Sequence, residues 1–539
     1  MNDQDTFLHV KDISKKTGQL IELDSKKLPK LPYPYENWED PPIEKLSDDK
    51  LATRDASLDG IMNVAVPIPA TDEEKEQLVA KFLVGLKKLL SKENNWPFLK
   101  AFMLSVDNCV KCNTCSTACP IFESSGRAEI YRPPFRSDVL RRIINKYVKP
   151  GGKLTAKFTG ADIDLNWETV ARLAQLAYRC TLCRRCAQTC PMGVDNGLIS
   201  REIRKLYSQE LGIHPQELHE DGTVKQLDTG SSTGITPVAL MDIMEFAEED
   251  LTDRTGLKVS LPFDKEGADI LLIHNAGEFL SWPENLQAFA IIFEAAGLSW
   301  TMSSDLVGYD SVNYGLFYDD TQFARVTLAH AEIARKLGVK KVVIGECGHA
   351  HKAAMAIGDR IWLQEANVHR ESSMTLLEDL VCNGKIKVDP ERNNFPVTLH
   401  DPCNITRSMG IVQPQRNVLK KICPQFREMT PHGAQNYCCG GGSGFAIMGS
   451  HNFPTWRMSV SGRKKFEQIL NAYTREEMDV SVNKYVCAPC SNCKGQIRDL
   501  ITYYDAYERC RIQYGGLVEL IVNCMTDVKE GFIEWDDFH

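Results

Sequence analysis

The sequence lacks an excess of basic charge, a long apolar run and a recognisable secretory signal. Its 63 Lys and Arg residues face 72 Asp and Glu residues, which excludes a general affinity for nucleic acid because phosphate binding needs a basic face. The longest apolar stretches, such as residues 288–298 with Glu294 inside, are too short for a bilayer span. Residues Met1–Asp5 are polar and acidic, so we expect no secretory signal. These absences predict a cytoplasmic chain without a membrane-spanning helix.

Cysteine, in contrast, is abundant, with 19 residues in 539. In a secreted protein this number would indicate disulfides, but no signal supports secretion. Most of the cysteines are grouped at the short spacings of metal ligands. We therefore expect thiolate ligation in a reducing compartment.

Two segments, 109–120 and 180–191, share the run C-x-x-C-x-x-C-x-x-x-C-P. Bacterial two-cluster ferredoxins have this run, and the fourth cysteine of each run ligates the other cluster. Structural zinc sites also use Cys-x-x-Cys pairs, but they have no use for the repeated spacing and the terminal Cys-Pro. On this rule one cubane [4Fe–4S] cluster is held by Cys109, Cys112, Cys115 and Cys190, and the second by Cys180, Cys183, Cys186 and Cys119.

Helical patterns before and after each cysteine run predict an α-helical ferredoxin domain over 71–213. It begins at a capping box, Thr71–Glu74. Residues 1–70 contain many prolines and show no sustained period, so we expect an extended N-terminal arm. This arm is either disordered or lies on a partner subunit through Tyr33, Tyr35 and Trp38. A polar connector over 214–260 follows the ferredoxin domain.

The rest of the chain predicts α/β architecture. Short apolar runs at 270–273, 341–344, 397–399 and 485–486 have the character of buried parallel strands. Helical patterns at 284–297, 322–337 and 413–422 lie between them. We expect two consecutive lobes, one over 261–390 and one over 391–539.

Three cysteine motifs occur in the second lobe. His400-Asp-Pro-Cys403 follows one predicted strand, Cys438-Cys439 precedes a glycine-rich loop, and 487–493 reads Cys-Ala-Pro-Cys-Ser-Asn-Cys. Loops at the carboxyl ends of parallel strands line a single crevice. We therefore expect the cysteines of this lobe to converge.

These motifs resemble the CCG, or cysteine-rich, domain of the heterodisulfide reductase family, which follows a ferredoxin domain in that family. The resemblance implies a noncubane [4Fe–4S] cluster. Cys487 is an alternative partner for Cys490, but the run from Lys494 to Ile497 matches the family better when 490 and 493 are the ligands. The implied catalytic ligands are Cys403, Cys438, Cys439, Cys490 and Cys493.

The first lobe looks like a degenerate copy. Residues 273–277, 313–315 and 345–349 stand where the three motifs would be, and within these three segments only Cys347 is a cysteine. One thiolate cannot hold a five-thiolate cluster, so we expect none here. Cys347 and His349 either face the cluster of the other lobe or are simply packed.

Among related proteins, the chain most resembles the K subunits (DsrK) of the Dsr membrane complexes of sulfate reducers. The resemblance rests on a first lobe without the cluster cysteines, on residues 345–350 and on the long N-terminal arm. This resemblance implies a haem b membrane subunit (DsrM-like) that oxidises menaquinol. It also implies a small DsrC-like protein whose disulfide or trisulfide is reduced in sulfite or sulfate respiration. The chain would then be a disulfide or trisulfide oxidoreductase, peripheral on the inner face of the cytoplasmic membrane.

Three alternatives stay open. The chain could be the electron conduit of a flavin-dependent glycolate or glycerol-3-phosphate type dehydrogenase, a low-molecular-weight heterodisulfide reductase, or an assembly module in which clusters only stabilise the fold.

Thiol products need protons, and histidine titrates near neutrality. His400 and His432 are therefore candidate acids, although for His400 we favour a hydrogen bond that orients a ligand loop. Arg179, Arg184 and Arg185 surround the second cysteine run. They either offset the negative charge of its cluster or are ordinary solvated residues.

Overall fold

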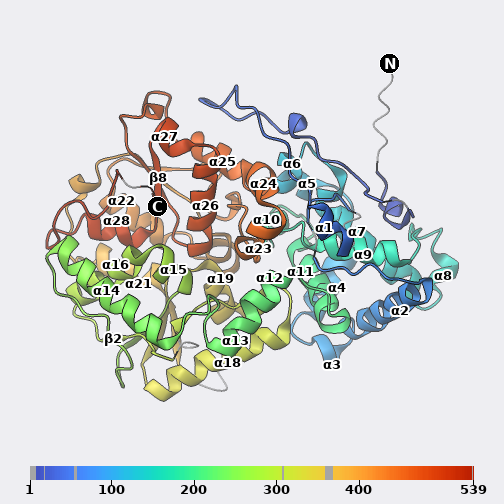
Figure 1. Ribbon diagram of the computed structural model, residues 1–539, viewed down its shortest axis with the longest axis horizontal. Coiled ribbons are helices and arrows are strands. Elements are labelled where there is room, and N and C mark those ends of the chain that lie inside the picture. The colour runs from blue at the N-terminus through green and yellow to red at the C-terminus, as the bar shows by residue number, and fades with distance from the viewer. Residues whose placement is uncertain are drawn as a thin grey trace.

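The computed structural model describes residues 8–16, 18–53, 58–62, 64–305, 309–358, 368–536 and 538. Met1–Asp5, on which the expectation about a secretory signal rests, lie outside this set. Figure 1 shows a helical part on one side of the molecule and a part with two sheets on the other. Within the described residues no helix combines the length and the apolar character needed to cross a bilayer.

The helical part surrounds both cysteine runs. Its first long helix, α2, begins as the capping box predicts, because the Thr71 side chain accepts a hydrogen bond from the Glu74 N–H. Phe82, Leu86 and Leu89 on the inner face of α2 are buried. The helices are α2 (Asp72–Leu89), α3 (Lys92–Asn95), α4 (Leu99–Asp107), α5 (Thr114–Ala118), α6 (Pro120–Ser124), α7 (Pro133–Ile143), α8 (Gly152–Thr155), α9 (Trp167–Ala177), α10 (Arg185–Gln188) and α11 (Asn196–Leu206).

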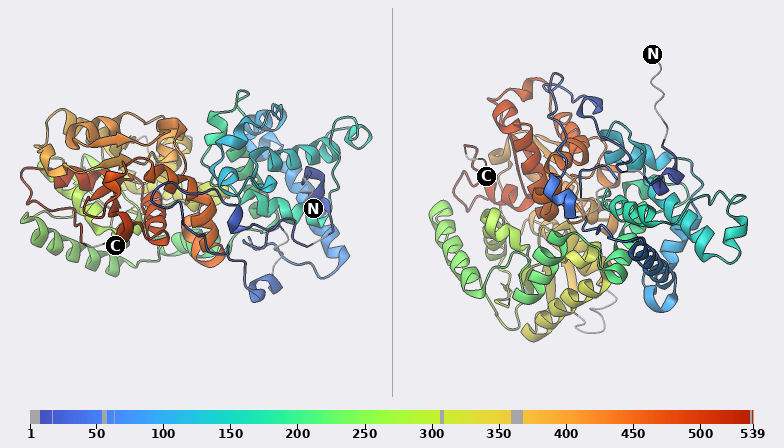
Figure 2. Two further views of the ribbon diagram at one scale, coloured as in Figure 1. Left: turned by 90° about the horizontal axis from the view of Figure 1, so that it is seen from above. Right: turned by 45° about the vertical axis from the view of Figure 1, so that its right-hand side comes forward.

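The described part of the N-terminal segment before α2 is mostly irregular, with two 3-10 turns and the short helix α1 (Asp48–Thr53), and it lies on this chain itself. It runs from the helical part across the surface of the C-terminal part (Figure 2). The buried Tyr35 packs edge-on against Phe466, with ring centroids 5.2 Å apart, and its hydroxyl donates to the Tyr504 carbonyl at 2.9 Å. Trp38 packs against the same Tyr504 ring. The expectation of disorder or of a partner surface for Tyr35 and Trp38 was therefore wrong.

Two four-stranded parallel sheets form the rest of the molecule. The first has the order β2-β1-β3-β4 and the second β6-β5-β7-β8, so the two strand orders are the same. The strands are β1 (Ile270–Ile273), β2 (Trp300–Thr301), β3 (Lys341–Ile344), β4 (His369–Ser372), β5 (Val397–Leu399), β6 (Phe426–Glu428), β7 (Lys484–Cys487) and β8 (Ile512–Gly515).

Helices cover both sheets, and α16 of the first sheet region packs on α28 of the second. His274 directly follows β1 as His400 directly follows β5. These helices are α15 (Ala276–Ser281), α16 (Pro283–Ala295), α18 (Asp320–Leu337), α19 (Gly348–His351), α21 (Ser373–Cys382), α22 (Pro414–Ile422), α25 (Arg463–Leu470), α26 (Ser491–Tyr503), α27 (Ala506–Cys510) and α28 (Leu517–Asn523).

The segment 214–260, which the sequence presents as a connector, is largely helical. Its longest helix, α14 (Pro237–Thr255), starts with the Thr236 side chain capping the Ala239 N–H and buries one face through Leu240, Met244 and Leu251. The segment therefore contributes packed structure between the helical part and the first sheet.

Candidate functional site

The first predicted group of cysteines lines one small cavity. Cys109, Cys112 and Cys115 from the first run meet Cys190 from the second run around it. Cys112 is exposed and Cys115 is buried. The left-handed backbone of Asn113, with φ of 62°, turns the chain between them.

The second predicted group is deeper in the molecule. Burial raises the pKa of Cys186 well above its ordinary value, and the neighbouring Cys183, Cys180 and Cys119 add to the shift. Cys119, from the first run, therefore lies with three cysteines of the second run. The fourth cysteine of each run lies beside the first three of the other.

The late cysteines also gather at one place. Cys438 and Cys439 are buried with Cys490 and Cys493, and the sulfurs of Cys439 and Cys493 are 3.4 Å apart. Cys403 is half-buried at the edge of the group, close to Cys438. Such an assembly of free thiols, with no disulfide among them, fits a metal cluster better than an apolar core.

Cys487 does not belong to this group. It is the last residue of β7, and it packs with Tyr485 in the core on one side of the sheet. Val486 packs on the other side with Cys490 and Cys493. The alternation of side chains along a strand explains the separation.

The late cysteines lie directly against the second ferredoxin group. Contact with the Cys438 thiol, together with burial, raises the pKa of Cys183 well above its ordinary value. The glycine-rich loop permits this approach, since a Cβ at Gly442 would lie 3.1 Å from the Thr181 carbonyl oxygen. The two groups of cysteines are thus neighbours although they are far apart in the sequence.

Two buried arginines join the two groups through backbone carbonyls. The Arg407 guanidinium donates to the carbonyls of Cys183, at 2.6 Å, and Asn436, at 2.7 Å. The Arg204 guanidinium donates to the Cys180 carbonyl at 2.7 Å. The sequence around Arg407 does not identify it as a site residue, because a single arginine in a helical turn resembles any surface residue.

The three arginines expected near the second run have different roles. Arg179 is fully buried and paired with Asp59, and Arg184 is paired with Asp195. Arg185 donates to the Ala118 carbonyl at 2.5 Å. Because Arg179 and Arg184 are paired with carboxylates, only Arg185 is left among them to offset thiolate charge.

His400 lies within the late cysteines, whereas His432 is exposed. One nitrogen of His400 and the sulfurs of Cys439 and Cys493 are within 4.8 Å of one another. Burial and the neighbouring Lys465 lower the pKa of His400, so its neutral form is favoured. A neutral ring beside thiolates fits the expected orienting role better than acid catalysis.

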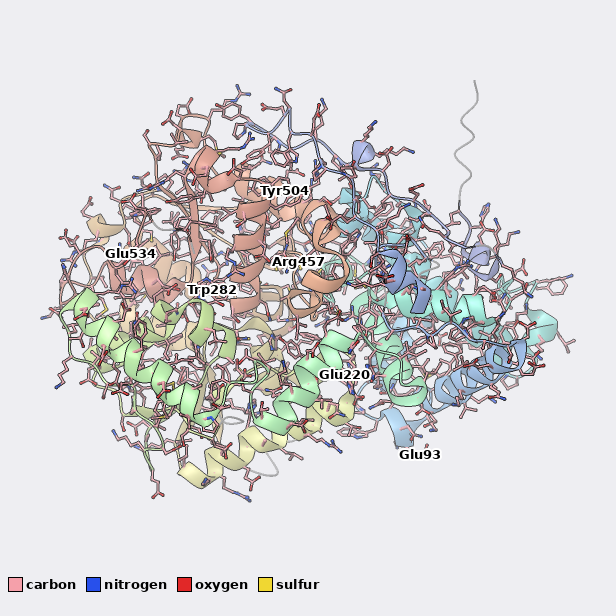
Figure 3. All side chains as sticks on the ribbon, in the orientation of Figure 1. Glu93, Glu220, Trp282, Arg457, Tyr504 and Glu534 are labelled. Atoms are coloured by element: carbon pink, nitrogen blue, oxygen red, sulfur yellow. The ribbon has the colours of Figure 1, made fainter. Side chains whose placement is uncertain are left out.

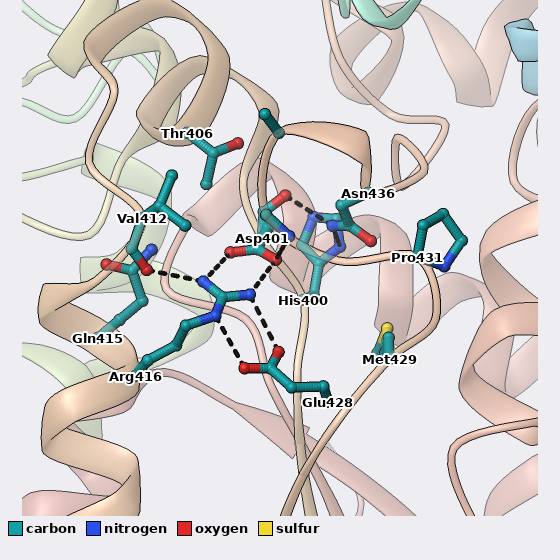
Figure 4. A network of polar contacts seen from close by, with 12 residues as sticks. His400, Asp401, Thr406, Val412, Gln415, Arg416, Glu428, Met429, Pro431 and Asn436 are labelled. Atoms are coloured by element: carbon teal, nitrogen blue, oxygen red, sulfur yellow. Dashed lines mark hydrogen bonds and ion pairs between the residues drawn. The ribbon is translucent and has the colours of Figure 1, made fainter.

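A polar network behind His400 fixes the loop that carries it (Figure 4). The Asp401 carboxylate accepts two hydrogen bonds from the Arg416 guanidinium, at 2.7 and 2.6 Å, and one from the Gly433 N–H at 2.6 Å. Arg416 also pairs with Glu428 at 2.8 Å. These bonds join β5, β6 and the loop before Cys438.

Lys465 is a buried cation beside the late cysteines that sequence reasoning missed. Its ammonium donates to the Asn436 side-chain oxygen at 2.8 Å. Burial lowers its pKa to about 7, although the nearby Asp401 and Cys439 favour the charged form. The lysine-rich helix around it gave no reason to choose this residue over Lys464.

The first sheet region contributes a cover over Cys490. The Gly348 N–H donates to the Cys490 sulfur at 3.2 Å, and the His349 ring contacts the Asn492 amide at 2.5 Å. Burial alone would raise the pKa of Cys347, but the His349 imidazole holds it down at about 6. Gly348 and His349 thus lie against the segment 490–492, whereas the Cys347 side chain packs in the core of the first sheet region.

Comparison with known proteins finds two matching domains and several similar iron–sulfur subunits. Residues 105–194 match the 4Fe-4S dicluster domain and residues 397–498 match the cysteine-rich (CCG) domain. The chain is 26% identical over 488 residues to the Hdr-like menaquinol oxidoreductase iron-sulfur subunit 2 of Archaeoglobus fulgidus, covering 83% of each chain.

Two further relatives agree. The Hdr-like menaquinol oxidoreductase iron-sulfur subunit of Archaeoglobus profundus is 25% identical, over 79% of this chain and 80% of its own. The HdrD subunit of the dihydromethanophenazine:CoB–CoM heterodisulfide reductase of Methanosarcina acetivorans is 24% identical, over 74% of this chain and 89% of its own. The chain is thus an HdrD-like iron–sulfur protein with a 4Fe-4S dicluster domain and a CCG domain.

Proposed function

We propose that this chain is the catalytic iron–sulfur subunit of a membrane-associated complex that reduces a disulfide or trisulfide of a small DsrC-like partner protein. The observation that carries this proposal is the group of five late cysteines, half-open at Cys403 and in contact with the second ferredoxin group through Cys438. A pure conduit would need no such open group at the far end of its chain of clusters.

The ligand assignment is part of the proposal. The two ferredoxin groups hold cubane clusters with the fourth cysteines exchanged, and the five late cysteines hold a noncubane cluster. The identical strand orders, and the matching places of His274 and His400, support two pseudo-symmetric lobes of which the first is degenerate. The boundaries at 70, 213, 260 and 390 separate the arm, ferredoxin domain, connector and lobes.

Residues around the clusters position them, orient their ligands and exclude water. When bound, the clusters carry single electrons, and the noncubane cluster offers iron to a sulfur of the substrate. Arg407 and Gly442 hold the second and third groups close together, while His400 and Gly348 orient the sulfurs of Cys439 and Cys490. Burial of the four inner cysteines excludes water from all but the Cys403 side.

With clusters bound, the exposed Cys112 side of the first group would receive electrons and the Cys403 side of the late cysteines would deliver them. The name of the Archaeoglobus relatives supports menaquinol as the donor. We propose that a haem b membrane subunit (DsrM-like) oxidises it and that the chain lies peripherally on the inner face of the cytoplasmic membrane. This arrangement would serve sulfite or sulfate respiration.

Electron paramagnetic resonance of the purified protein tests the proposal. Adding a thiol oxidant should produce a new paramagnetic signal from the substrate-side cluster, and a haem b protein should co-purify. If the oxidant produces no new signal and a flavoprotein co-purifies instead, the chain is a conduit.

Replacement of Lys465 by Met should lower the reduction potential of the third cluster when it is measured near pH 6, below the Lys465 pKa of about 7, where this side chain is charged. A buried unit charge within about 8 Å of the cluster stabilises an added electron by roughly 2 kcal/mol at an effective dielectric constant near 20. This corresponds to a shift in potential on the order of 90 mV for one electron. Lys464→Met is the matched control, because Lys464 pairs with Glu467. A potentiometric titration in which both variants shift equally contradicts the assigned role.

A further inference from the structure

A buried group of charged side chains lies between the two sheet regions, behind the segment that carries Cys490 and Cys493. Its members are Glu278 on α15, Glu346 after β3, Lys494 on α26 and Glu519 on α28. Three carboxyl groups share one ammonium group here, so the carboxyl groups outnumber the cation in a site that water hardly reaches. Charges of this kind are costly to bury unless protons neutralise them.

Hydrogen bonds connect the members into one network. Lys494 pairs with Glu278 at 2.5 Å and with Glu519 at 3.4 Å. The Asn285 side-chain amide donates to both Glu346, at 3.1 Å, and Glu519, at 3.0 Å. One further oxygen each of Glu278 and Glu519 is buried without a hydrogen-bond partner. Such oxygens are where a carboxyl proton can reside.

One side of the network reaches solvent. Glu519 lines a pocket of about 470 Å³, together with Glu284, Tyr485 and Tyr514. Trp282 and Glu534, which Figure 3 labels, also line this pocket. Protons can therefore enter the network from the pocket without passing the Cys403 opening.

The other side touches the frame of the late cysteines. The Glu346 backbone carbonyl accepts from the Ser491 N–H at 2.8 Å, and two residues later Gly348 donates to the Cys490 sulfur. The Glu346 carboxylate accepts from the Leu517 N–H at 2.9 Å, at the start of α28. Negative charge added at Cys490 therefore repels the Glu346 carboxylate and favours its protonated form.

We propose that Glu346, when it is ionised, binds one proton that enters from the pocket through Glu519 as the late-cysteine centre gains one electron. The balance is simple, since a water-derived proton joins a carboxylate to give a neutral carboxyl group and no covalent bond of the chain breaks. The electron comes from the ferredoxin groups. This inference rests on the proposed function and adds to it a proton uptake that compensates the charge of the added electron.

The charges around Glu346 set the pH range. Burial and the Glu519 carboxylate raise the pKa of Glu346 to about 8, although Lys494 opposes the shift. Burial also raises the pKa of Glu278 well above its usual value. The titratable groups that face the network are Glu278, Glu284, Glu519, Lys494, Tyr485 and Cys487.

A potentiometric titration of the intact cluster-loaded protein, followed by electron paramagnetic resonance at several pH values, tests the inference. Below pH 8 Glu346 keeps its proton in both redox states, so the potential should be constant. Above pH 8 reduction draws in a proton, and the potential should fall by up to about 59 mV for each tenfold fall in proton activity. A plot of potential against pH should therefore bend near pH 8. Glu346→Gln should remove this bend.

A second variant tests the inference even if Glu346→Gln does not fold. Glu519→Gln removes the carboxylate that raises the pKa of Glu346, so the bend should move to lower pH. Glu534→Gln, in the same pocket but outside the network, is the control and should leave the bend in place. A bend that survives in Glu346→Gln, or does not move in Glu519→Gln, overturns the inference. Loss of the third cluster's signal from the unmodified protein would instead remove the proposed function.

Discussion

Cys438→Ser should abolish sulfur–sulfur bond reduction and the oxidant-dependent paramagnetic signal, while both ferredoxin clusters remain. Cys438 lies between Cys183 of the second group and Cys403 at the opening, so its loss removes a ligand and the contact with the electron supply. Iron analysis should fall from about twelve to about eight atoms per chain, because one of three four-iron clusters is lost.

Cys487→Ala is the matched control for this variant. Cys487 is equally buried and close in sequence to Cys490, but it points into the core on the other side of β7. The variant should keep the iron content, the signal and the activity, and lose only about 1 kcal/mol of stability for a small buried side chain. Full activity in Cys438→Ser, or loss of the cluster in Cys487→Ala, contradicts the assignment of ligands.

The central strands of both sheets could be predicted from the sequence, and the edge strands could not. β1, β3, β5 and β7 lie in the middle of their sheets and are apolar on both faces, which gives a recognisable run. The edge strand β4 reads His-Arg-Glu-Ser and β6 reads Phe-Arg-Glu. These two edge strands each have only one neighbour and carry polar side chains, so their sequences resemble loops.

The candidate site shows the same division. Metal-ligand spacing identified cysteines that the structure brings together, because several ligands of one cluster come from a single short run. Arg407, Lys465 and Glu346 each come alone from a different element. Nothing local distinguishes them from surface charges, and only the folded chain brings them beside the cysteines.

The surface that the N-terminal arm covers was missed for a related reason. Proline-rich sequence without a period predicts an extended chain, but it does not say which surface the chain covers. The buried Asp59 at the end of the arm provides the attachment. It could not be recognised because its partner Arg179 is 120 residues away.

Asp59→Ala should destabilise the whole helical part. The Asp59 carboxylate accepts from the Arg179 guanidinium at 2.8 and 2.5 Å, and from the Tyr131 hydroxyl at 2.9 Å. Without it a fully buried guanidinium loses its counter-charge, which costs about 3–5 kcal/mol. Because Arg179 directly precedes Cys180, we expect a lower thermal midpoint together with earlier loss of the second cluster's visible absorbance.

Two further variants distinguish the buried charge from a general effect of mutation. Asp59→Ala combined with Arg179→Met removes both charges and should recover most of the lost stability, because an apolar replacement of a buried pair is often neutral. Asp72→Ala breaks the exposed pair with Lys75 and should leave the thermal midpoint almost unchanged, because water and salt screen an exposed pair. If the double variant is no more stable than Asp59→Ala, the contact of the arm with Tyr131, and not the unpaired guanidinium, controls the stability of the helical part.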